Sequence, residues 1–404
     1  MAMRALTIAG ALAIAACAPR PLPLSPFDHA AAGAETLARV SYQLRWRGAV
    51  VGDATLAIVR RRDAVTIDRR DTLRLRRGDA SVTRTLRIVV EANAALVPRA
   101  LRWWRDELPE QHAERRTDGW FVDGTWVADA AAVPSELVPL LAARDHGFVG
   151  PVLLPGDTLL VGAGEVTALA EGQHLARVTI AGVVRRSVVT LATDGLPSQI
   201  IDDTGVTASR VDALPPTTAS ADVLALGALP VAGAPGPTLA LTIVDGATPA
   251  LPELAGQRVI ATDTAELTVA LAPPPRLDGA IARITAMVAD AIAPSLAMPA
   301  TPAAGDCTTF ALELHAALGR AGIAAQLVTG YLLVDGTLWR HRWVVAWTGR
   351  AWVQVDATQP QPGADHLALR LHGTTAADLW AADAAFIAIS AARYLPAARP
   401  DHAS

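Results

Sequence analysis

The sequence predicts an α+β protein in which a β-rich N-terminal domain precedes a C-terminal domain that combines helices with antiparallel strands. Three observations lead to this class. Apolar and polar residues alternate with period two in several stretches between residues 35 and 212, as they do in half-buried strands. Apolar residues recur at helical spacing from Leu277 to Ile292. Residues 323–357 alternate again around two turn-like dipeptides, which predicts successive hairpins.

The composition supports folded domains and argues against nucleic-acid binding. Hydrophobic residues make up 51% of the 404 residues and charged residues 18%, so the chain can bury a sizeable core. The formal net charge is −4, and every basic residue other than histidine is arginine. No basic footprint for DNA or RNA is therefore expected.

The strand-like segments of the N-terminal half form two groups, each with the spacing of an antiparallel sheet. The first group comprises residues 40–46, 56–58, 65–67 and 73–75, and the second comprises residues 166–169, 176–180 and 183–191. A Pro- and Thr-rich stretch at residues 214–220 is typical of a linker. We therefore expect one β-rich domain that ends near residue 212.

Two helices are expected in the C-terminal half. The first carries the apolar stripe that begins at Leu277, and we expect it to end at Pro294. The second opens at Asp306-Cys307 and runs to Arg320, with Gly322 as its C-terminal cap. Asp306 is of the residue type that caps helix N-termini, and we expect it to support an oxyanion site there.

Cys307 is a candidate nucleophile. At the start of a helix, the backbone N–H groups and the macrodipole favour the thiolate, which is the form that attacks carbonyl carbons. The alternative is a buried cysteine that behaves as a small hydrophobic residue.

His341 and Asp356 are candidate partners of this thiol. A two-residue loop at Thr348-Gly349 would place His341 opposite Asp356 on neighbouring strands, with Cβ atoms about 5 Å apart. Asp356 would then orient the imidazole, and His341 would take the proton of Cys307. The same face carries Trp343, Trp347, Trp352 and Gln354, which either belong to the core or line a cleft for an extended peptide.

Five short motifs in this region occur in an order and spacing that resemble the transglutaminase-like superfamily. They are Gly305-Asp306-Cys307, Ala321-Gly322-Ile323, Gly330-Tyr331, His341-x-Trp343 and Trp352-Val353-x-Val355-Asp356-x-Thr358 followed by Gln359. The resemblance covers about residues 277–375. It implies a papain-like core with Cys307 as nucleophile, His341 as base and Asp356 as orienting group. Two positions depart from the family pattern, Val345 in place of an acidic residue and Ala357 in place of proline.

The N-terminus has the features of a secretion signal. Arg4 precedes an apolar run from Ala5 to Ala16 that is too short to span a bilayer. The run ends in Ile14-Ala15-Ala16-Cys17, which resembles a bacterial lipobox, so we expect lipidation of Cys17 and a membrane anchor. Ala18, directly after this cysteine, resembles the context in which lipoproteins are sorted to the outer membrane, so we expect the anchor at its periplasmic face. The alternative is an ordinary cleaved signal in which Cys17 is incidental.

These observations divide the chain into six expected segments. They are a lipoprotein signal peptide at residues 1–16, a flexible tether at 17–34, a β-rich domain at 35–212, a linker at 213–237, a β-rich connecting segment at 238–275 and a transglutaminase-like catalytic domain at 276–400. If Cys17 is lipidated, Cys307 is the one cysteine of the chain that keeps a free thiol.

Three further histidines, His315, His366 and His372, are expected to be surface or hydrogen-bonded residues rather than ligands. Their spacing predicts no metal site, and the sequence indicates no cofactor.

The function that these features predict is that of a secreted, membrane-anchored envelope thiol hydrolase. It would cleave, or transfer, amide bonds of a peptide or protein substrate through an acyl-Cys307 intermediate. Hydrolysis is favoured because no calcium loop and no acceptor-amine site is indicated. The alternative is a catalytically silent envelope module that binds peptide or glycan. The oligomeric state is not predicted.

Overall fold

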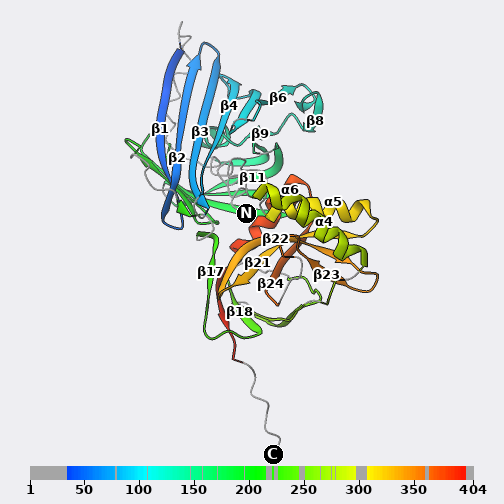
Figure 1. Cartoon of the computed structure of the whole chain (residues 1–404). Coiled ribbons are helices and arrows are strands. Elements are labelled where there is room, and N and C mark those ends of the chain that lie inside the picture. The colour runs from blue at the N-terminus through cyan, green and yellow to red at the C-terminus, as the bar shows by residue number, and fades with distance from the viewer. Residues whose placement is uncertain are drawn as a thin grey trace, which may run out of the picture. The chain divides into compact units, whose positions relative to one another are not determined.

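A computed structural model describes residues 34–396 (Figure 1), apart from 78–79, 107, 146, 157, 171, 195, 215–220, 223–225, 245–250, 264, 274, 278, 297–306 and 360–363. The chain divides into an N-terminal unit that ends at Leu226 and a C-terminal unit that starts at Gly227. Most elements are strands and a few are helices, so the predicted α+β class is confirmed. The predicted signal peptide, tether, lipidation site Cys17 and N-cap Asp306 lie outside the described residues. Within the described part of the chain, no helix has the length and apolar character that crossing a membrane requires.

The N-terminal unit is built around one long sheet. Its strands are β1 Ala34–Trp46, β2 Ala49–Arg61, β3 Ala64–Arg77, β4 Ala80–Asn93, β5 Pro98–Arg105, β6 Gln111–Arg116, β7 Gly119–Val122, β8 Thr125–Ala128, β9 Val133–Pro134, β10 Phe148–Leu154, β11 Leu160–Ala170, β12 Gln173–Ile180, β13 Val183–Leu191, β14 Pro197–Asp202, β15 Val206–Val211 and β16 Ala221–Asp222. The order is β8-β7-β6-β5-β4-β3-β2-β1-β15-β14-β13-β12-β11-β10-β9, and β16 pairs with β3. The predicted segments 40–46, 56–58, 166–169, 176–180 and 183–191 lie in β1, β2, β11, β12 and β13. Segments 65–67 and 73–75 are both parts of β3, and strands β4 to β8 were not predicted.

The inner face of this sheet is closed by the segment that follows β9. Helix α2, Val138–Asp145, buries Val138, Leu140 and Ala142 almost completely. Two fully buried tryptophans use their indole N–H groups to bind backbone carbonyls, Trp103 that of Gly156 at 3.1 Å and Trp120 that of Ala132 at 2.8 Å. Bonds of this kind satisfy the polar atom of a large buried side chain.

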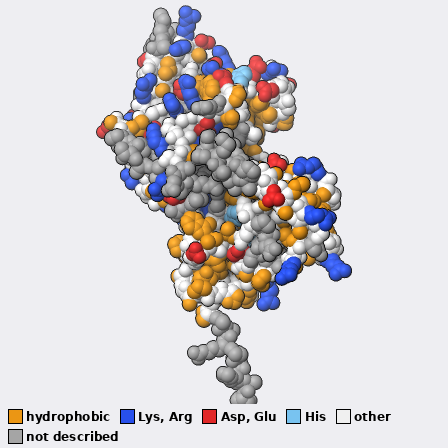
Figure 2. Space-filling model, viewed as in Figure 1, with side chains coloured by type: hydrophobic (Ala, Val, Ile, Leu, Met, Phe, Trp, Pro, Cys, Tyr) orange, Lys and Arg blue, Asp and Glu red, His pale blue; other side chains and the backbone are white. Residues whose placement is uncertain are grey.

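The outer face of the sheet carries many arginines. Figure 2 shows cationic and anionic side chains over this unit on the face in view. Several arginines pair with carboxylates of neighbouring strands, such as Arg87 with Asp68 at 2.7 Å and Arg102 with Glu91 at 2.6 Å. Cross-strand pairs of opposite charge stabilise adjacent strands modestly.

The C-terminal unit combines a mixed nine-stranded sheet with helices. Its elements are β17 Leu229–Ala232, β18 Thr238–Ile243, β19 Gln257–Thr262, β20 Glu266–Leu271, α4 Gly279–Leu296, α5 Cys307–Arg320, β21 Ala325–Val334, β22 Thr337–Trp347, β23 Trp352–Val355, β24 His366–His372, α6 Ala376–Asp383, the 3₁₀ turn η2 Ala384–Ile387 and β25 Ile389–Tyr394. The sheet order is β19-β20-β18-β25-β17-β22-β21-β24, with β23 paired to β22.

The boundary between the two units differs from the expected one. Strands β17 to β20 fall in the expected linker at 213–237 and connecting segment at 238–275, yet they belong to the C-terminal sheet. The reason is that β25, near the C-terminal end of the described chain, pairs with β18 and β17. Pairing between segments this far apart in sequence leaves no trace in local periodicity.

Each face of the C-terminal sheet packs against a separate core. On one face α4 and α5 bury Ile281, Phe310 and Leu314 against apolar residues of β21, β22 and β23. Helix α4 continues past Pro294 to Leu296, beyond its expected end. A proline in the last turn removes one backbone hydrogen bond but does not stop the remaining residues of that turn.

A buried glutamine closes one edge of this sheet. In the strand order β24 has β21 on one side, and the Gln257 side chain occupies its other side. The Gln257 amide accepts a hydrogen bond from the Ala368 N–H at 2.7 Å and donates one to the Ala368 carbonyl at 3.0 Å. A second amide hydrogen binds the Pro252 carbonyl at 2.9 Å. The side chain thus takes the place of a neighbouring strand and fixes the strand that begins at His366.

Replacing Gln257 with methionine should destabilise the full chain by about 2–4 kcal/mol, because two backbone groups of Ala368 would be buried without partners. Urea denaturation followed by tryptophan fluorescence measures this change. Gln326→Met, at an exposed position of β21, is the control and should stay within about 0.5 kcal/mol of wild type. Equal stabilities of the two variants would contradict this account of the edge.

Candidate active site

Cys307 is the first residue of helix α5 and is a free thiol, with 7% of its surface exposed. The helix holds it in place because Phe310, Leu314 and Leu318 pack into the core beneath. The thiol makes a hydrogen bond with His341. Its position at the N-terminal end of a 14-residue helix favours the thiolate over the thiol.

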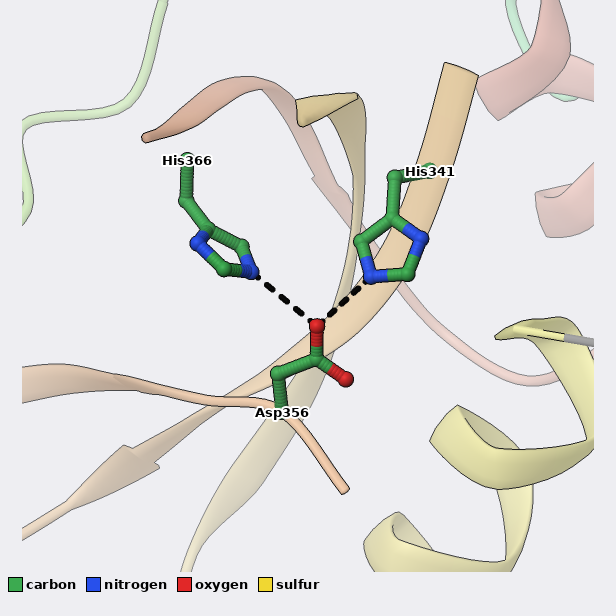
Figure 3. A group of neighbouring side chains, drawn as sticks. All are labelled: His341, Asp356 and His366. Carbon is green, nitrogen blue, oxygen red and sulfur yellow. Dashed lines mark hydrogen bonds and ion pairs between the residues drawn. The ribbon is translucent and has the colours of Figure 1, made fainter. Parts of the chain in front are cut away.

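His341 lies on strand β22 and is buried, as is Asp356, which directly follows β23. The imidazole Nε2 and the carboxylate Oδ2 are 2.6 Å apart (Figure 3). Because His341 Nε2 is hydrogen-bonded to Asp356, Nδ1 is the ring nitrogen of His341 that is available to Cys307. The structure therefore brings together all three residues that the sequence singled out as nucleophile, base and orienting group.

The strand register behind this contact differs from the predicted one. Trp347 pairs with Trp352 and Val344 with Val355, so four residues rather than two form the connection. Thr348 closes that loop, because its N–H binds the Ala351 carbonyl at 3.0 Å. A shift of two residues keeps every side chain on its predicted face of the sheet. Asp356 consequently reaches His341 from just beyond the end of β23 instead of from a position directly opposite.

The Asp356 carboxylate accepts four hydrogen bonds. Oδ1 accepts from the N–H and the hydroxyl of Thr358, both at 2.8 Å, and Oδ2 accepts from His341 and from His366, the latter at 3.0 Å. Burial by itself would raise the pKa of Asp356, but the bonds from His341 and His366 outweigh it and hold this pKa below its usual value. The orienting residue is therefore an anion at neutral pH.

His366 is hydrogen-bonded, which is one of the two states expected for it, but the sequence analysis did not place it in the site. It is buried at the start of β24, and its Nδ1 lies 2.7 Å from Asp365 while its Nε2 faces Asp356. Burial lowers the pKa of His366, but the two carboxylates outweigh it and raise the pKa overall. No local motif marks this residue, because it reaches the site only through the pairing of β24 with β21.

His341, Asp356 and His366 together offer three ligand atoms within 4.8 Å of one another, a set that can hold a metal ion. In the geometry present, however, both imidazoles bind the same oxygen. The 2.6 Å between His341 and Asp356 is shorter than the roughly 3.3 Å between two atoms that bind one zinc ion at about 2.0–2.2 Å. The arrangement is thus that of a hydrogen-bonded chain.

The charge state of His341 follows from its two neighbours. Burial favours the neutral imidazole and lowers the pKa of His341, but the hydrogen bonds with Asp356 and Cys307 outweigh it and raise the pKa above its usual value. A raised pKa means that the imidazolium persists at neutral pH, where it stabilises a thiolate on Cys307.

Arg342, the neighbour of His341, fixes helix α5 against the sheet. Its guanidinium donates to the hydroxyls of Thr308 and Thr329, each at 3.1 Å, and to Asp383 of α6 at 2.6 Å. Thr329 is also 3.0 Å from His372 Nε2. Burial, and secondarily the charge of Arg342, lower the pKa of His372 to about 4, so this histidine is neutral and its Nε2 accepts a hydrogen bond from the Thr329 hydroxyl.

Two of the four expected cleft residues are covered. Trp343 and Gln354 are 1% and 2% exposed and bind each other, the indole N–H donating to the amide oxygen at 3.0 Å. Trp343 also stacks on His341, with ring centroids 5.8 Å apart. These two side chains therefore pack beneath the site and do not line an open groove. Leu254 and residues of β24 cover the side of the sheet on which Trp343 lies. Trp347, 39% exposed, lies beside Trp352 and remains at the surface.

The comparison with family models agrees with this site. Residues 294–357 match the model of the transglutaminase-like superfamily, so the resemblance seen in the sequence is confirmed for this segment. The matched segment contains Cys307, His341 and Asp356 and belongs to the C-terminal unit. The superfamily generally includes cysteine-dependent enzymes, although some of its members are inactive. No curated protein and no solved structure matches the chain.

Gly330 should tolerate no side chain. A Cβ atom on it would lie 2.1 Å from the Leu367 carbonyl oxygen and 2.6 Å from the Trp343 ring, and Trp343 supports His341. Gly330→Ala should therefore cost about 3 kcal/mol in stability and slow the alkylation of Cys307. Gly319→Ala, in α5 with open space around it, is the control and should be neutral or stabilising. Calorimetric melting and iodoacetamide labelling measure the two effects, and equal behaviour of the variants would contradict the role assigned to Gly330.

Removing His366 should shift the pH dependence of Cys307 while leaving the thiol reactive. In His366→Ala, Asp356 loses one charged hydrogen bond and His341 becomes its only imidazole partner. The loss of about 1.5–3 kcal/mol at the carboxylate should move the pH profile of alkylation by about one unit. His112→Ala, at an exposed position of the N-terminal unit, is the matched control. A profile of His366→Ala identical to that of His112→Ala would show that His366 is not a positioning residue.

Proposed function

We propose that the protein is a thiol hydrolase that cleaves amide bonds with Cys307 as nucleophile, His341 as acid and base, and Asp356 as orienting group. The observation that carries the proposal is the continuous chain of hydrogen bonds from Cys307 through His341 to Asp356 at the start of a helix. Nucleophile, base and orienting group are the three parts that covalent acyl transfer needs. The match of this segment to a superfamily that includes cysteine-dependent enzymes supports the same chemistry.

The proposed reaction has two stages. In the first, Cys307 Sγ attacks the carbonyl carbon of the substrate, and the C–N bond breaks as His341 Nδ1 gives its proton to the leaving amine. In the second, water attacks the thioester, His341 takes a proton from that water, and the acid product leaves Cys307. The oxyanion of each tetrahedral intermediate would be stabilised by backbone N–H groups at the start of α5, with Asp306 as the expected N-cap.

The substrate that we propose is a peptide or protein, bound in a papain-like or transglutaminase-like arrangement of helix and sheet. Hydrolysis is proposed over transfer to an amine, since the sequence indicates no dedicated acceptor-amine site. The chemistry requires no cofactor.

The setting that we propose is the cell envelope. Secretion across the inner membrane and lipidation of Cys17 would anchor the protein at the periplasmic face of the outer membrane. Metabolic labelling with a palmitate analogue tests the anchor: Cys17→Ser should abolish the label, and Cys307→Ser should retain it.

A catalytically silent module that binds peptide or glycan is the alternative function. The observation that favours it is the burial of Cys307 and His341, each no more than 7% exposed. The two functions differ in the reactivity that they require of the thiol.

Alkylation of Cys307 by iodoacetamide across pH separates the two, measured in a Cys17→Ser background that leaves one thiol. The thiolate of the intact protein should react at pH 6 at least about tenfold faster than in His341→Ala or in the guanidinium-unfolded chain, because a free thiol ionises near 8.5. Asp356→Ala should lie between these limits. Slow labelling that is equal in all three folded proteins would instead support the silent module.

A further inference from the structure

The N-terminal unit contains an apolar pocket that the proposed reaction does not use. It lies on the inner face of the sheet, between strands β1, β2, β3, β14 and β15 and the segment that leads into α2. Its empty volume is about 690 Å³ when the space at its open mouth is included. Several non-hydrogen atoms therefore fit inside. Apolar side chains make up most of the wall, among them Leu44, Leu56, Ile58, Ile67, Leu140 and Ile200.

Two polar groups of the pocket wall are buried without a hydrogen-bond partner. Tyr42 is 6% exposed and Glu136 is 4% exposed. Among the described residues nothing accepts from or donates to the Tyr42 hydroxyl or Glu136 Oε1, although Ser135 binds the other Glu136 oxygen at 3.0 Å. Leaving such atoms unpaired costs about 1–3 kcal/mol each, so both are suited to bind a polar group that enters the pocket.

The charges around these two groups favour a neutral ligand. Arg69 is the one cation among the described residues of the wall, and Asp71 already engages it through two hydrogen bonds at 2.9 and 2.7 Å. Glu136 Oε1 is 4.0 Å from the same guanidinium. Burial raises the pKa of Glu136 to about 7, so this carboxyl is able both to donate and to accept. An anionic head group would meet the Glu136 carboxyl group and a guanidinium whose charge Asp71 already balances.

We propose that this pocket binds a small neutral amphiphile, whose hydrocarbon chain lies among the leucines and isoleucines and whose hydroxyl group hydrogen-bonds to Tyr42 and Glu136. A hydroxyl is both donor and acceptor, so one such group has the chemistry to satisfy both orphaned atoms. The remainder of the binding free energy comes from apolar surface removed from water. The proposal does not depend on the chemistry of Cys307.

Isothermal titration calorimetry of the full chain with 1-octanol, in detergent-free buffer, tests the proposal. Saturable binding is expected, with octanoate at least about tenfold weaker because its charge finds no free partner. Tyr42→Phe should weaken octanol binding about fivefold, the effect of one hydrogen bond. Tyr394→Phe, in the C-terminal unit, is the matched control and should bind as wild type does. Ala208→Leu, which places a larger side chain in the wall, should abolish binding.

The melting temperature of ligand-free Tyr42→Phe supplies a second readout. It should equal or exceed that of wild type, since the change removes a buried hydroxyl that has no partner. A fall of several degrees would show that this hydroxyl already has a partner inside the protein, which would overturn the proposal. Octanoate binding as tight as octanol binding, unchanged affinity in Tyr42→Phe and Ala208→Leu, or no saturable heat at all would overturn it equally.

Discussion

The C-terminal site depends on one buried carboxylate that is completely satisfied. Asp356 accepts hydrogen bonds from a strand residue on each side, His341 and His366, and from both the backbone and the hydroxyl of Thr358. An anion taken out of water is tolerated only when most of its lone pairs accept hydrogen bonds, and the loss of any one partner raises the free energy of the buried charge. The carboxylate thus does more than orient an imidazole. It requires β22, β24 and the loop after β23 to hold one particular arrangement.

This constraint explains why apparently unrelated features accompany the site. Strand β24 must lie close enough for His366 to reach Asp356, which is why Gly330 leaves no room for a Cβ atom between the strands. The Gln257 side chain then closes the outer edge of β24 with a pair of hydrogen bonds to the Ala368 backbone. Each feature is far from the others in sequence, but all help to hold the carboxylate oxygens of Asp356 in one position. Changes at these positions are expected to reach the thiol through geometry, without contact with substrate.

The sequence predicted which side chains meet at the site more reliably than how the surrounding strands position them. Cys307, His341 and Asp356 could be found because a helix start, a strand and a hairpin leave local patterns, and because a shift of two residues preserves the face on which a side chain lies. The register itself was wrong, since Thr348 builds a four-residue loop from hydrogen bonds that composition does not reveal. The places of His366 in the site and of β17 to β20 in the C-terminal sheet were missed for a different reason. Their roles arise from pairing between distant segments, which no periodicity within one segment records.

Two neighbouring residues of β22 finally show how the helix and the sheet are held in register at the nucleophile. His341 contacts Cys307, and Arg342 donates to the hydroxyl of Thr308, so adjacent residues on the strand bind adjacent residues at the start of α5. Arg342 is anchored in turn by Thr329 and Asp383, which are satisfied before any substrate binds. A sliding or rotation of α5 that moved the thiol away from the imidazole would also break the guanidinium contacts. The contact between the thiol and the imidazole is therefore maintained by a neighbouring residue that is not itself part of that contact.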